Sequence, residues 1–234
     1  MSTFTTQTDS GKSGLTMLRR LMIIALAISM VLALVPTSTL AAGQQFHFRF
    51  AGKGAEAGWT NCPTQPEAGV VCTDTFLFTA EEVFKEDGSS FQSTTLFMDQ
   101  ISYKFDRKGN FIFVSESFGF GEATLLVDQN LNSASVSATV PLFTCTVDRK
   151  GNFTCAEGGS ATVNASWTGT GDLVRVNDNY HAVSKGFTYN AHFRGKFREA
   201  SASGQVNGSD VGTQFFAQIL EVRSGEVFVC HGEC

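Results

Sequence analysis

Apolar side chains recur at every second position along most of the chain after residue 44. This period places successive side chains on opposite faces of an extended backbone, so it predicts half-buried β-strands. It is clearest over residues 45–50, 95–105, 134–140, 161–167 and 187–197. No long stretch has the period of an amphipathic helix. Residues 79–84 could form a single helical turn, and the ambiguous segment 214–223 is assigned to a strand.

Turn-forming residues separate these runs at regular intervals. They lie at 87–88, 106–110, 128–132, 148–152, 207–208 and 224–225. Short strands at this spacing predict an all-β fold, an antiparallel sandwich or barrel of about ten to twelve strands. The alternation changes phase at Pro141 and again after Phe197, and each change predicts a β-bulge or a strand that crosses a corner.

The hexamer Asp-Arg-Lys-Gly-Asn-Phe occurs twice, at 106–111 and at 148–153. The segments around the two copies diverge quickly, whereas a repeat array would be similar to itself throughout. We therefore interpret the hexamers as two hairpins that use the same turn, with glycine at the left-handed position.

The N-terminus has the three zones of a secretory signal. Basic residues (Lys12, Arg19 and Arg20) precede an apolar run of fifteen residues, 21–35, and the small residues around Ala41 and Ala42 offer a cleavage site. The run is shorter than the roughly 20 residues of a membrane-spanning helix. We predict a signal peptide over 1–42, with Met17 as an alternative start, and a single extracellular β-domain over 43–234.

Charge limits the partners of the exported part. Loss of residues 1–42 leaves 14 basic against 21 acidic residues, a formal charge of −7. An overall field of this sign does not attract nucleic acid or an anionic membrane. We therefore expect no nucleic-acid partner, and no membrane association after cleavage.

All six cysteines lie in the exported part, and an even number in an exported chain favours disulfides. Pairing of Asp148 with Asn152 across a tight turn would place Cys145 opposite Cys155, within disulfide reach. Cys62 and Cys72 have the same separation, and Cys230 and Cys234 remain at the C-terminus. We predict the bridges 62–72, 145–155 and 230–234. The C-terminal Cys-His-Gly-Glu-Cys fits no zinc or haem spacing, so no metal or cofactor is predicted.

Polar side chains occupy one face of the predicted strand 187–198, opposite its aromatic face. The predicted ligand-binding residues are Asn190, His192, Arg194, Lys196 and Arg198, together with His47 and Arg49 of the first strand. If the two strands are neighbours, these side chains form a cationic patch suited to carboxylates or phosphates. The alternative is a solvated face whose charges pair with Asp and Glu on adjacent strands.

Other candidate features have ordinary structural explanations. Residues 177–181 are interpreted as a polar loop, because they lack the ligand spacing of a calcium site. Trp167 follows the inward alternation of its strand and is expected in the core, whereas Trp59, beside Cys62, could not be placed.

The sequence contains no nucleophile elbow, zinc-protease, P-loop or Rossmann motif, and no catalytic residue is predicted. The leading hypothesis is a secreted, non-catalytic β-domain that binds an extracellular ligand or surface, with an anionic glycan as the favoured class. The alternatives are an extracellular hydrolase with a dispersed active site and a structural or adhesive surface protein.

Overall fold

The computed structural model describes residues 45–86, 89–148, 151–184 and 187–231. The predicted signal peptide, 1–42, lies outside these residues. Within them, ten strands form one antiparallel sheet, which confirms the all-β prediction. The strands are β1 (Gln45–Asn61), β2 (Val71–Glu86), β3 (Ser89–Phe105), β4 (Phe111–Val127), β5 (Ser133–Val147), β6 (Phe153–Gly169), β7 (Val174–Ser184), β8 (Phe187–Val206), β9 (Ser209–Asp210) and β10 (Thr213–His231).

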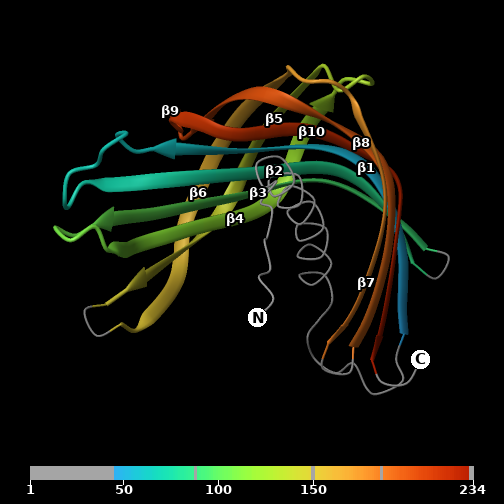
Figure 1. Ribbon diagram of the computed structural model, residues 1–234, viewed down its shortest axis with the longest axis horizontal. Helices are drawn as coiled ribbons and strands as arrows, with labels where there is room; N and C mark the ends of the chain where they lie inside the picture. The colour runs from blue at the N-terminus through green and yellow to red at the C-terminus, as the bar shows by residue number, and fades with distance from the viewer. Residues whose placement is uncertain (1–44, 87–88, 149–150, 185–186, 232–234) are drawn as a thin grey trace, which may run out of the picture.

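The sheet closes into a ring, because β10 pairs with both β8 and β1. Going round, the order is β1 to β6, then β8, β10 and back to β1. One edge of β8 is shared by two partners: residues 187–197 pair with β7, and residues 200–206 pair with β6. The sheet therefore continues beyond the ring as an extension, in which β7, the first part of β8, the end of β10 and the start of β1 lie side by side (Figure 1).

The interior of the ring is the main hydrophobic core. Alternate residues of all eight ring strands contribute to it, many of them alanine or valine. The two tryptophans fill most of the remaining space: each is 1% exposed, and the Trp167 indole donates a hydrogen bond to the Glu56 carbonyl at 2.9 Å. The prediction for Trp167 is therefore confirmed, and Trp59 joins the same core.

A second hydrophobic cluster lies in the extension, on the opposite face of the sheet. Its buried members are Phe50, Ala191 and Val227. This explains the phase change after Phe197: β8 has no bulge there, but passes from one cluster to the other. The phase change at Pro141 is a true irregularity, with a register shift between Pro141 and Phe143.

The aromatic face of β3 is not the face that enters the core. Leu96 and Met98 are fully buried in the ring, whereas the odd-numbered side chains, among them Phe97 and Tyr103, lie on its outer face. Both faces of β3 carry apolar residues, so the alternation alone could not choose between them. Residues 79–84, considered as a helical turn, belong to β2, and 214–223 belong to β10 as predicted.

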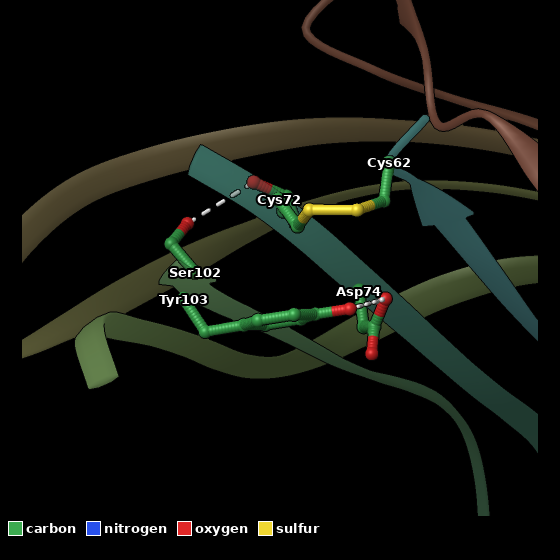
Figure 2. The surroundings of a disulfide bond; sticks show 6 residues. Cys62, Cys72, Asp74, Ser102 and Tyr103 are labelled. Carbon is green, nitrogen blue, oxygen red and sulfur yellow. Dashed lines mark hydrogen bonds between the residues drawn. A yellow bond between two sulfur atoms is a disulfide. The ribbon is translucent and has the colours of Figure 1, made fainter. Parts of the chain in front are cut away.

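Two predicted disulfides are present. The Cα atoms of Cys62 and Cys72 are 4.7 Å apart, and those of Cys145 and Cys155 are 4.0 Å apart. Figure 2 shows the first bridge beside Tyr103, whose hydroxyl donates to Asp74. Such pairs are compatible with an extracellular protein. The third predicted bridge involves Cys234, which lies outside the described residues.

Candidate functional site

The predicted ligand-binding residues lie in the extension, but on strands that are not neighbours. β10 runs between β1 and β8, so that Arg49 pairs with Glu226, and Glu226 pairs with His192. In the same way Phe228 separates His47 from Asn190. The patch was predicted for the case that β1 and β8 are neighbours, and the structure shows that they are not. The intervening strand adds a carboxylate to the patch.

Glu226 contacts both of the predicted ligand-binding residues on β1. Its carboxylate accepts hydrogen bonds from His47 Nε2 at 2.6 Å and from Arg49 Nε at 3.1 Å. These two bonds lower the pKa of the Glu226 carboxyl, and the bond from His47 has the larger effect. The carboxylate thus holds both side chains in place, and the Arg49 guanidinium offsets its charge.

β7 supplies side chains from residues 177–181, which were predicted to form a loop. The carboxamide of Asn179 bonds the His192 ring, and His181 bonds Asn190 at 2.6 Å. Residues 177–181 are strand, paired with β8 over their whole length. Alternation of Val174 and Val176 with polar residues was the signal for this strand. The run of Asn and Asp, which favours turns, concealed it.

Together these residues line a hollow of about 520 Å³. Its lining is His47, Asn179, His181, Asn190, Ala191, His192, Glu226 and Phe228. A second hollow, of about 480 Å³, shares His192 and Glu226 with the first and adds the cations Arg49, Lys85 and Arg223. We call the two hollows together the extension groove. Glu226 is the only carboxylate among its lining residues.

Lys196 closes the ring interior at the end that faces the groove. Its ammonium group lies 3.0 Å from Glu221 and donates to the Gln129 carbonyl at 2.7 Å, and the side chain is buried. Burial raises the pKa of Glu221, but bonds from Lys196 and Arg223 outweigh this and leave the pKa below its ordinary value. Lys196 is thus a structural cation and not a free member of the predicted patch.

The remaining predicted cations differ in exposure. Arg194 is exposed and pairs with Asn177 in register, so it lies at the edge of the groove. Arg198 lies one alternation further into the ring than Lys196, and its Nε is buried with no partner among the described residues. Neither side chain lines the two hollows.

The groove lies on the face of the sheet that forms the ring interior. β1 pairs with β2 without a shift from Phe48 to Asn61, so Arg49 shares a face with Ala55 and Trp59. His192 shares a face with Ala200 along the unbroken β8. The groove therefore continues the interior surface beyond the Lys196–Glu221 pair, at a mouth of the ring. Barrel mouths are frequent ligand sites.

Several carboxyl groups elsewhere have raised pKa values. Burial raises the pKa of Glu82 to about 7, and burial together with the charge of Glu116 raises that of Asp99 to about 6. Burial also raises the pKa of Glu56, and the hydrogen bond from Gln218 opposes this rise. A carboxyl that keeps its proton near neutral pH can serve as a general acid. These groups lie on the outer face of the ring, away from the groove.

In the described ranges, no group of three or more His, Cys, Asp or Glu side chains is arranged to hold a metal ion. The same ranges contain no helix with the length and apolarity needed to cross a membrane. Comparison of the chain with protein-family models, with curated proteins and with solved structures found no match.

Proposed function

We propose that the protein is a secreted binding module and that the extension groove holds an anionic extracellular ligand, with acidic glycans as the favoured class. The observation that carries the proposal is the composition of the groove. Three imidazoles and three cations line it, against one lining carboxylate, Glu226, which bonds His47 and Arg49. Of the cations, Arg223 also bonds Glu221, which lies outside the lining.

The chemistry of these groups suits carboxylates and sulfates on sugars. Arg49 and Arg223 offer planar donor sets for such anions. Asn179, Asn190 and the imidazoles offer hydrogen-bond donors and acceptors for sugar hydroxyls. Phe228 provides an apolar surface among them, against which the face of a sugar ring can pack. A hollow of several hundred Å³ is the size of a small-ligand site.

The test is binding of residues 43–234 to an array of acidic and neutral glycans at low and high salt. We expect binding to acidic glycans that weakens as salt rises, because the attraction is screened. Arg49→Ala/His192→Ala should reduce the affinity about tenfold or more, because it removes the hydrogen bonds of one guanidinium and one imidazole. Lys104→Ala removes a cation from β3, at the far end of the sheet, and should bind like the wild type.

Three results would contradict the proposal. One is the absence of binding at any salt. Another is equal loss in the groove variant and in Lys104→Ala, which would place the ligand elsewhere. The third is cleavage of an arrayed glycan. This would favour the hydrolase, with the carboxyl groups of raised pKa on the outer face as candidates for its general acid.

A further inference from the structure

Apolar side chains gather at the end of the sheet opposite the groove. β1 begins beside the groove and ends at Asn61. There the connection to β2 lies beside the β3–β4 turn, at the left of Figure 1, and β5 ends and β6 begins further along the same side of the sheet. Gly69 N donates to Phe105 O at 2.9 Å, and the rings of Phe113 and Phe153 are 5.8 Å apart. We call six exposed residues at this end the tip patch: Val70, Val71, Phe111, Ile112, Val147 and Phe153.

The tip patch contains two largely exposed phenylalanine rings. Phe111 and Phe153 are each 57% exposed, although other residues of the same two strands are buried. They occupy the same place in the two copies of Asp-Arg-Lys-Gly-Asn-Phe, the last residue of each hexamer. Clustered exposed apolar side chains mark interaction sites more often than single ones do.

The backbone beneath the patch is fixed in several ways. Asp106 accepts bonds from the Lys108 and Asn110 amides, which closes the first turn. Asp148 bonds Asn152 in the same manner. The bridges Cys62–Cys72 and Cys145–Cys155 staple the other two connections (Figure 2 shows the first). The backbone that carries the apolar side chains is therefore ordered, and a partner need not spend free energy ordering it.

Cations flank the apolar side chains. Arg107 and Lys108 are exposed in the turn that ends at Phe111. Phenylalanine beside lysine and arginine is the combination that enters the interface of an anionic bilayer, where the ring is buried among acyl chains and the cations meet headgroup phosphates. A symmetric contact between two copies would instead place two sets of Arg107 and Lys108 in one interface, and the mutual repulsion of these cations disfavours it.

We propose that the tip patch docks the protein on an anionic lipid surface. The acidic charge of the whole chain predicts no such attraction, but at physiological salt charges act over about 8 Å. The attraction then depends on the β3–β4 turn, where Arg107 and Lys108 outnumber the one carboxylate, Asp106. Docking at this end leaves the extension groove at the opposite end of β1, facing away from the lipid. The protein would then present its groove from a surface.

The test is co-sedimentation of residues 43–234 with vesicles of phosphatidylcholine, with and without phosphatidylglycerol. All ten strands lie within 45–231, so this form holds the whole strand ladder. We expect sedimentation with the anionic vesicles only. Phe111→Ser/Phe153→Ser should reduce vesicle affinity about tenfold. Arg107→Ala/Lys108→Ala should reduce it by about fivefold for each cation.

The matched control is Phe91→Ser/Phe120→Ser, which removes two rings of similar exposure outside the patch and should sediment like the wild type. Arg49→Ala/His192→Ala should also sediment normally, which separates this proposal from that for the groove. No sedimentation with anionic vesicles, or equal loss in the Phe91/Phe120 control, would overturn the proposal. So would a dimer in sedimentation velocity that the Phe111/Phe153 variant abolishes, since a second copy would then occupy the patch.

Discussion

Trp167→Ala should lower the free energy of unfolding by about 3–5 kcal/mol, because it removes the largest class of side chain from a packed interior. Trp167 is 1% exposed, lies among the alternating residues of β5, β6 and β8, and bonds the Glu56 carbonyl across the ring. Its loss leaves a cavity between opposite walls and an unpaired carbonyl. Urea unfolding followed by circular dichroism measures the change.

Leu126→Ala is the matched control for this variant. Leu126 is 68% exposed on the outer face of β4, so its truncation should change the stability by no more than about 0.5 kcal/mol. A loss of less than about 1 kcal/mol for Trp167→Ala would mean that the interior is not closed round this side chain, and that the ring opens in solution.

Removal of the bridge across the β5–β6 hairpin should cost about 3 kcal/mol. The reason is that Cys145 and Cys155, at a sequence separation of 10, close a loop whose freedom in the unfolded chain the bridge restricts. The double variant Cys145→Ala/Cys155→Ala, unfolded in urea, measures this cost. Both residues lie in register, so the change leaves the strand pairing intact.

Thr146→Ala/Thr154→Ala is the control, because this pair lies next to the bridge on the same two strands and both side chains are exposed. It should cost less than about 1 kcal/mol in total. Equal costs for the two double variants would show that the bridge adds no stability beyond that of the hairpin.

The sequence predicted local features of the fold and missed those that depend on distant pairing. The spacing of Cys145 and Cys155 about a single turn was enough to predict their bridge. The face of β3 could not be chosen, because Leu96 and Phe97 are both apolar and only ring closure decides which one is enclosed. Closure itself joins β10 to β1 and β8, strands whose pairing leaves no local signal.

The same limit applies to the candidate site. His47, Arg49 and His192 were named from the polar alternation of their strands, and they do line the groove. Glu226 was missed because nothing in its own strand shows that β10 lies between β1 and β8. Lys196 was placed with the free cations, since its burial beside Glu221 depends on that same strand.

The central claim is that the extension groove binds an anion, and Glu226→Gln tests it most directly. The amide can still bond His47 and Arg49, but the only carboxylate of the lining is lost. Calorimetric titration with the tightest acidic glycan of the array should show an affinity several-fold higher than that of the wild type at low salt, a gain that fades as salt rises. An affinity that is unchanged or lower would contradict the claim, because Glu226 would then not oppose the charge of the ligand.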